Sequence, residues 1–306
     1  MEPMRYDGRV AVISGAGRGL GRAYALLLAS RGARVVVNDV GVDLSGVGKD
    51  SGPAHEVVDE IRAAGGEAIA STDSVATSEG GNAIIAAAAE QWGRIDILIH
   101  NAGNVRRGPL AGFAQTDFDE VLDVHLRGGF HLVRAAFPRM IAAGYGRIVM
   151  TTSIGGLYGN SDVVPYCVSK AGLIGLALNA AIEGAPHNIK SNVIVPAAVT
   201  RMAEGLDTSQ YPPMAPELVA PAVAWLAHER CSVTGEMLIA LAGRIARAFV
   251  TESVGVWRPD WTIEAVDEQI DRIRDQSATV TFPQGPGGFG QHLGFSFQMA
   301  RDGAAR

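Results

Sequence analysis

A tyrosine and a lysine, Tyr166 and Lys170, lie four residues apart in a segment of helix-forming composition. Side chains at positions i and i+4 of a helix share one face, so the phenol and the ammonium would be neighbours. To act as a base near neutrality, a tyrosine must lower its pKa from about 10 to about 7. An adjacent ammonium favours the phenolate. The pair therefore predicts acid–base chemistry with Tyr166 as the proton-exchanging group.

A serine supplies the third candidate group for the same chemistry. Ser153 lies 13 residues before Tyr166, directly after a predicted strand over residues 146–152. Its hydroxyl could hold a substrate oxygen beside the phenol. The three side chains together predict a reaction in which an alcohol or carbonyl oxygen loses or gains a proton.

A glycine-rich turn near the N-terminus predicts a dinucleotide site. The first predicted strand runs directly into SGAGRGLG at residues 14–21. Gly15, Gly19 and Gly21 fit the spacing GxxxGxG, whereas GxGxxG fails because Leu20 and Arg22 occupy the third glycine position in its two registers. A strand, a glycine loop and a helix in this order seat a pyrophosphate on the helix N-terminus.

The end of the second predicted strand indicates which nicotinamide cofactor is used. Asp39 lies 20 residues after Gly19, where a carboxylate can accept hydrogen bonds from the adenosine ribose. It would repel a 2′-phosphate, so NAD is favoured over NADP. Arg18 argues the other way, because a cation in the glycine loop could pair with that phosphate. Asp73, after the third predicted strand, could accept from the adenine amino group or cap a turn.

These residues are spread over alternating strands and helices. Short β-branched runs separate longer Ala/Leu-rich segments, and this alternation predicts a parallel sheet with helices on both faces. The fold class is a doubly wound, Rossmann-type α/β fold with seven strands. The predicted strands are 9–14, 34–39, 67–71, 95–101, 146–152, 189–195 and 237–242, and the helices lie near 20–31, 54–64, 78–92, 117–143, 165–184 and 216–227.

The last part of the chain differs in composition. Residues 1–242 are predicted to form one dinucleotide-binding and catalytic domain, and residues 243–306 a C-terminal extension. The extension has a helix-like stretch over 262–275, followed by a segment rich in Gly and Phe. That segment could lie on a neighbouring subunit or stay mobile.

Composition narrows the class of partner and the compartment. The 306 residues carry a net charge of −6 and are 47% hydrophobic, which favours a small-molecule partner over nucleic acid or an anionic membrane. Apolar stretches such as 171–182 fall short of the roughly 18 residues of a membrane span. Two cysteines indicate a reducing compartment, and no motif predicts a metal. The first residues lead straight into a strand, without a signal peptide. We therefore expect a soluble, cytoplasmic protein.

Several motifs together resemble the short-chain dehydrogenase/reductase family over about residues 7–242. They are SGAGRGLG, the NAG at 101–103, Ser153, YCVSK at 166–170 and NVIVP at 192–196. A narrower resemblance is to the (3R)-hydroxyacyl-CoA dehydrogenase portion of peroxisomal multifunctional enzymes. It rests on VVVNDVG at 35–41, STDSV at 71–75, VHLRG at 124–128, YGN at 158–160 and AIEG at 181–184.

The resemblance implies NAD(P)-linked hydride transfer between an alcohol and a carbonyl. The implied catalytic residues are Ser153, Tyr166 and Lys170, with Lys170 also holding the nicotinamide ribose. The implied cofactor contacts are Gly15, Arg18, Gly19, Leu20, Gly21, Asp39, Asp73, Ser74, Asn101, Ala102, Gly103, Tyr166, Lys170, Pro196 and Thr200. The favoured substrate class is a 3-hydroxyacyl-CoA, oxidised with NAD. The alternatives are an NADPH-dependent 3-oxoacyl or ketone reductase and a non-catalytic nucleotide-sensing protein.

Two histidines depart from the family pattern. Where many members place an asparagine that completes a proton relay, this chain has His125, which could stand in for the amide or serve a structural role. We include His125 among the candidate catalytic residues. His100, in HNAG, is interpreted as a packed core residue. The small residues over 171–181 match a helix that pairs subunits in this family, which suggests a homodimer or homotetramer.

Overall fold

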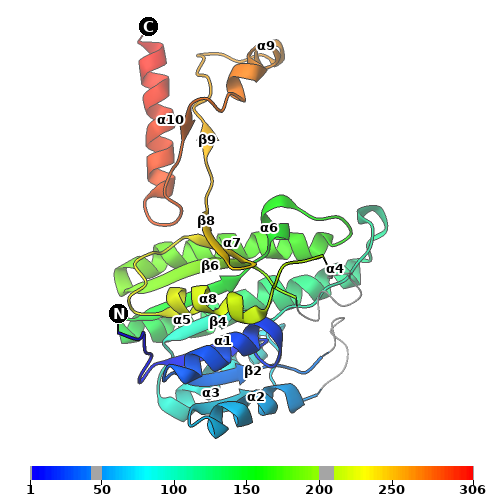
Figure 1. Cartoon of the computed structure of the whole chain (residues 1–306). Coiled ribbons are helices and arrows are strands. Elements are labelled where there is room, and N and C mark those ends of the chain that lie inside the picture. The colour runs from blue at the N-terminus through cyan, green and yellow to red at the C-terminus, as the bar shows by residue number, and fades with distance from the viewer. Residues whose placement is uncertain (1, 43–49, 200–209, 306) are drawn as a thin grey trace. The chain divides into compact units, whose positions relative to one another are not determined.

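The computed structural model describes residues 2–42, 50–199 and 210–305 (Figure 1). These residues belong to two units, Met1–Arg247 and Ala248–Arg306. The division lies within the strand Arg244–Ala248, five residues after residue 242. The description of residues 243–306 as an extension, rather than a separate functional domain, stays a prediction.

The first unit is built on an eight-stranded sheet in the order β3-β2-β1-β4-β5-β6-β7-β8. Neighbours from β3 to β7 run parallel. All seven predicted strands are confirmed. The strands are β1 Val10–Ser14, β2 Arg34–Asn38, β3 Glu67–Ser71, β4 Ile97–His100, β5 Gly146–Thr151, β6 Ile189–Ala197, β7 Met237–Leu241 and β8 Arg244–Ala248.

The predicted number of strands was wrong by one. β8 follows β7 after the two-residue turn Ala242-Gly243, so it runs antiparallel to β7. Both turn residues have positive φ angles, 48° and 80°, as a two-residue hairpin turn requires. The sequence interpretation missed β8 because RIARA contains two arginines and its side chains are largely exposed, as is usual for an edge strand.

Helices cover both faces of the sheet, as predicted (Figure 1). The helices α1, α2 and α8 pack together on one face, and α3, α5 and α7 pack together on the other. β1, β4 and β5 are buried throughout, which explains their apolar sequences without alternation. The helices are α1 Gly19–Ser30, α2 Gly52–Ala63, α3 Ser78–Trp92, α4 Gln115–Leu122, α5 Gly128–Ala143, α6 Ile154–Tyr158, α7 Val164–Gly184 and α8 Ala220–Ala227.

The helix predicted over 117–143 is interrupted. A π-helical turn, Asp123–Arg127, separates α4 from α5 and contains His125. Gly128 and Gly129 follow it and pack closely, since a Cβ on Gly129 would lie 2.8 Å from Leu173. Helix propensity does not reveal such a turn, because its extra residue is stabilised by tertiary contacts.

Helix α7 confirms the helix predicted over 165–184, but it is more apolar over its length than the sequence interpretation allowed. The stretch Val164–His187 meets the length and composition of a membrane span, although only by those two criteria. In this structure α7 packs along β5 and β6. Lys170, at its buried face, reaches the end of β5. The helix therefore forms part of the layer that covers the sheet.

The second unit contains α9 Ile263–Ile273, a two-stranded sheet of β9 Glu252–Ser253 and β10 Thr279–Val280, and α10 Gly288–Ala304. The helix predicted over 262–275 is confirmed, and Thr262 Oγ1 caps it by accepting from the Ala265 N–H at 3.1 Å. Helix α10 was not predicted, because its glycines and phenylalanines lower helix propensity.

Candidate functional site

The strands β1 and β4 are neighbours whose following helices pack on opposite faces of the sheet. In doubly wound folds such a reversal opens a crevice at the carboxyl edge, where ligands bind. The glycine loop follows β1, and the Asn101-Ala102-Gly103 turn follows β4. The fold therefore brings two of the predicted cofactor segments to this crevice.

The glycine loop has no room for a side chain at Gly15 or Gly21. A Cβ on Gly15 would lie 2.7 Å from Ala102 Cα, and one on Gly21 would lie 2.1 Å from the Gly15 carbonyl oxygen. Gly15 and Gly19 also have positive φ angles, 63° and 53°. Helix α1 begins without a side-chain cap, which leaves first-turn N–H groups for an anion. These features fit a dinucleotide pyrophosphate.

The Asp39 carboxylate is held beside this loop. Its Oδ2 accepts from the Gly17 N–H at 3.0 Å and its Oδ1 from the Gly41 N–H at 2.8 Å. Gly17 was not among the predicted site residues, although a Cβ there would come within 2.9 Å of Asp39 Oδ2. Arg18 lies at the helix start and its guanidinium is 3.9 Å from Asp50 at the surface.

The other predicted cofactor contacts lie in or next to three different elements of the fold. Asp73 and Ser74 are exposed after β3, where Asp73 Oδ2 accepts from Ser71 Oγ and Ser74 Oγ accepts from the Ala76 N–H. Both therefore make turn contacts, the alternative raised for Asp73. Leu20 lies in the first turn of α1, and Pro196 is buried near the end of β6. Thr200 lies outside the described residues.

The turn after β4 is tied to the glycine loop and to the π turn. Asn101 Nδ2 donates to the Gly15 carbonyl at 3.0 Å. A Cβ on Gly103 would lie 2.4 Å from His125 Cε1, so only glycine fits between this turn and the imidazole. Ala102 and Gly103 therefore contribute a backbone that fits closely against the glycine loop and His125, and not a functional side chain.

Ser153, Tyr166 and Lys170 are brought together at the end of β5. Ser153 caps α6 by accepting from the Gly155 N–H at 3.1 Å, and it hydrogen-bonds to Tyr166. Lys170 Nζ donates to the Thr151 carbonyl at 2.8 Å and lies 5.5 Å from the centroid of the Tyr166 ring. The predicted trio thus forms one cluster, joined by the i, i+4 spacing on α7 and by the strand end.

Burial shifts the pKa values of the two titratable members of this cluster. It raises the pKa of Tyr166, opposed by the Ser153 hydrogen bond, and it lowers the pKa of Lys170 to about 7. The sequence interpretation expected Lys170 to lower the pKa of Tyr166. In the structure the pKa of Tyr166 shifts in the opposite direction, because desolvation disfavours the charged forms of both side chains.

His125 lies against the tyrosine. Its ring meets the Tyr166 ring edge-on, with centroids 5.4 Å apart. Nε2 is 2.8 Å from the Asn104 carbonyl and 3.1 Å from the Asn104 N–H, while Nδ1 is buried and has no partner among the described residues. Asn104, which sequence reasoning missed, therefore orients the imidazole. The position of His125 fits either of its two predicted roles.

The chain is similar to known dehydrogenases over most of its length. The family model described as short chain dehydrogenase matches residues 9–210. Peroxisomal multifunctional enzyme type 2 from Drosophila melanogaster is 48% identical over 280 residues, covering 90% of this chain and 46% of that protein. The enzyme of the same name from Mus musculus is 43% identical, covering 90% and 38%. The chain thus spans less than half the length of these relatives.

The chain is also similar to solved structures of such enzymes. Full-length peroxisomal multifunctional enzyme type 2 from Drosophila melanogaster superposes with a TM-score of 0.81 and 39% identity, covering 97% of this chain and 50% of that one. A 7α-hydroxysteroid dehydrogenase complexed with NADH and 7-oxo glycochenodeoxycholic acid gives 0.71 and 30%, covering 78% and 95%.

The predicted cytoplasmic location is wrong on this comparison. The relatives from Drosophila melanogaster, Mus musculus and Saccharomyces cerevisiae are named as peroxisomal enzymes. Low cysteine content indicates only a reducing environment, and it does not distinguish one intracellular compartment from another.

Proposed function

The chain belongs to the short-chain dehydrogenase family, and we propose that it oxidises the secondary alcohol of a 3-hydroxyacyl-CoA with NAD. Enzymes of this family act on CH–OH groups with a nicotinamide cofactor. The observation that carries the proposal is the cluster of Ser153, Tyr166 and Lys170 at the same sheet edge as the glycine loop. A nucleotide-sensing protein would not need that trio.

The three side chains of the cluster would have different roles in the reaction. The Ser153 hydroxyl would hold the substrate oxygen, and Tyr166 Oη would take its proton. The cofactor, when bound, supplies the acceptor for the hydride of the carbinol carbon. Because burial holds the pKa of Tyr166 high, the phenolate needs a positive charge nearby, and a protonated Lys170 provides one. Lys170 is held for this role by the Thr151 carbonyl.

NAD is proposed over NADP because of the Asp39 carboxylate. Both of its oxygens are anchored by loop N–H groups, so it is held beside the glycine loop where an adenosine ribose would bind. Arg18 supports the alternative of an NADPH-dependent reductase. Its guanidinium is partly exposed and paired with Asp50 only at 3.9 Å, so it could turn toward a 2′-phosphate.

We also propose that the chain forms a homodimer or homotetramer. Large apolar side chains are exposed on the two adjacent helices α5 and α7: Phe130, Ile141, Val168 and Ile182. Exposed apolar side chains gathered on neighbouring elements favour association. Light scattering of the purified chain would test this.

The substrate and the cofactor can be tested in one assay. The purified chain is given 3-hydroxyacyl-CoA esters or simple secondary alcohols with NAD or NADP, and reduced nicotinamide is followed by absorbance. Turnover of the CoA esters with NAD supports the proposal. Turnover of free alcohols alone rejects the substrate class, and turnover with NADP alone rejects the role of Asp39.

A further inference from the structure

His100 is a buried residue with a polar partner at each ring nitrogen. It ends β4 and is fully buried, together with Ser14 at the end of β1 and His125 in the π turn. Its Nδ1 is 2.9 Å from Ser14 Oγ, and its Nε2 is 2.7 Å from the His125 carbonyl oxygen. One imidazole therefore bridges the strand end that begins the glycine loop and the turn that carries His125.

The direction of these hydrogen bonds follows from the groups involved. A carbonyl oxygen can only accept, so His100 Nε2 carries the hydrogen. Burial and the nearby Lys170 charge lower the pKa of His100 to about 4, so the ring is neutral and Nδ1 accepts from the Ser14 hydroxyl. Ser14 Oγ in turn accepts from the N–H groups of Asn101 and Ala102, at 3.1 and 3.2 Å. Every donor in this chain of bonds has an acceptor.

Packing holds the bridge in place. A Cβ on Gly129 would lie 3.1 Å from His100 Cδ2, so the glycine after the π turn leaves just enough room for the ring. On the other side, Gly103 lies directly against the His125 ring. His125 in turn lies edge-on to Tyr166.

We propose that His100 is a positioning residue that couples the cofactor-binding turn after β4 to the His125 side of the catalytic cluster. Through Ser14 it holds the backbone of Asn101 and Ala102, and through the His125 carbonyl it holds the imidazole that packs on Tyr166. This inference rests on the proposed roles of Tyr166 and of the NAG turn.

Three substitutions separate the two halves of the bridge. His100→Leu removes both hydrogen bonds and keeps apolar bulk. His100→Asn keeps an amide beside Ser14 but is too short to reach the His125 carbonyl. His100→Gln keeps a donor at the reach of Nε2. The measurements are NADH affinity by fluorescence, kcat on whichever alcohol or CoA ester the wild type oxidises, and thermal melting of each variant.

The proposal predicts a split between binding and turnover. His100→Leu should weaken NADH binding and lower kcat, each by about tenfold, the scale of one lost buried hydrogen bond. His100→Asn should keep NADH affinity within about twofold and lose kcat by about fivefold or more. His100→Gln should restore kcat to within about threefold of wild type. If His100→Leu does not fold, the contrast between Asn and Gln decides.

Two results would overturn the proposal. Wild-type NADH affinity and kcat in His100→Leu would show that the ring only fills space. Equal effects of Asn and Gln on kcat, following melting temperature alone, would show a purely structural role. NADH binding requires no substrate, so a wild-type chain that fails to oxidise CoA esters rejects the proposed function while leaving the binding comparison valid.

Discussion

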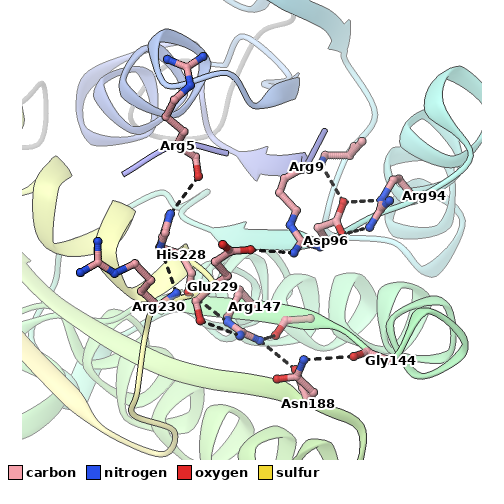
Figure 2. Close-up of polar contacts among 12 residues, drawn as sticks. Arg5, Arg9, Arg94, Asp96, Gly144, Arg147, Asn188, His228, Glu229 and Arg230 are labelled. Carbon is pink, nitrogen blue, oxygen red and sulfur yellow. Dashed lines mark hydrogen bonds and ion pairs between the residues drawn. The ribbon is translucent and has the colours of Figure 1, made fainter. Parts of the chain in front are cut away.

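The two ends of the parallel strands use buried polar groups in opposite ways. The amino-terminal ends of the strands form the amino edge of the sheet, and their carboxyl-terminal ends form the carboxyl edge. At the amino edge, Asp96 is fully buried before β4 and accepts from four donors (Figure 2). They are Arg9 Nη1 at 3.1 Å, Arg94 Nε at 2.8 Å, Arg94 Nη2 at 2.6 Å and the Val10 N–H at 2.9 Å. The carboxylate thus ties the starts of β1 and β4 together.

Arg147 extends this amino-edge network across β5 and β6. Its guanidinium is buried and donates to the carbonyls of Gly146, Asn188 and His228, at 2.7 to 3.2 Å (Figure 2). It also lies 4.3 Å from the centroid of the Tyr145 ring, over which Arg9 lies at 3.7 Å. These hydrogen bonds to carbonyl groups, together with the ring contact, make the buried charge tolerable.

The carboxyl edge leaves buried polar atoms without partners. Among the described residues, His125 Nδ1, Asn104 Oδ1 and Thr151 Oγ1 lack hydrogen bonds, and Lys170 is buried with its pKa lowered to about 7. Unpaired buried groups destabilise a fold. The comparison indicates that the amino edge stabilises the sheet, while the carboxyl edge carries unpaired polar groups at some cost in stability, as the proposed ligand site would require.

The largest effect should come from Tyr166→Phe at the carboxyl edge. Loss of the phenol removes the proposed proton acceptor, so kcat should fall by about 10³-fold or more. The melting temperature should stay close to wild type, since the ring is retained. Steady-state kinetics beside NADH binding measure this, and unchanged turnover would exclude Tyr166 as the acid–base group.

At the amino edge, Asp96→Asn should cost stability and leave the chemistry intact. Arg9 and Arg94, whose side chains are 24% and 43% exposed, would lose charge-assisted hydrogen bonds but stay in contact with water, so the free energy of unfolding should fall by about 1–3 kcal/mol. Urea unfolding measures the loss. The folded fraction should retain wild-type kcat, and a kcat that falls with stability preserved would contradict the separation of the two edges.

Lys170→Met should lower activity and raise stability near neutral pH. Between the lowered pKa of about 7 and the usual 10.5, the unfolded chain binds a proton that the folded chain does not, so wild-type stability rises with pH through this range. At pH 7 the variant should be more stable by about 2 kcal/mol, after allowing for the lost bond to Thr151.

The control for this pH effect is Lys170→Arg, which keeps a charge at every pH and should be less stable than wild type. Denaturant midpoints from pH 7 to pH 10 provide the comparison. Parallel pH profiles for wild type and Lys170→Met would show that Lys170 titrates normally in the folded chain.

The smallest effect should come from Glu229→Gln, also at the amino edge. The Glu229 side chain is 59% exposed where it pairs with Arg9 at 3.1 Å. Exposed pairs contribute about 0–1 kcal/mol and are screened by salt. In the same urea experiment, the free energy of unfolding should change by about 0.5 kcal/mol or less. A loss as large as that of Asp96→Asn would show that the polar groups of the amino edge act as one unit.

Much of the architecture could be predicted because it depends on neighbours in the chain. Seven strands were predicted from apolar runs, the glycine loop from its spacing after β1, and the proximity of Tyr166 and Lys170 from the helical repeat. β8 was missed because an exposed edge strand lacks the apolar signal of a buried one.

Parts of the site could not be predicted because their partners are distant in sequence. Gly17 meets Asp39 only once β1 and β2 are paired. Asn104 orients His125 across 21 residues, and the π turn around His125 shows no local propensity signal. Arg147, near the start of β5, is buried among carbonyl groups of segments distant in sequence, and nothing in its local sequence indicates those partners.

The sequence by itself determined the order of strands and helices, the glycine loop and the side-chain types of the proposed catalytic trio. These depend on local spacing, which is the same in any fold that forms the elements. Only the tertiary structure decided the bridge from Ser14 through His100 to His125, joining residues 86 and 25 positions apart. It also decided the lowered pKa of Lys170, because desolvation depends on everything packed around a group and not on its neighbours in the chain.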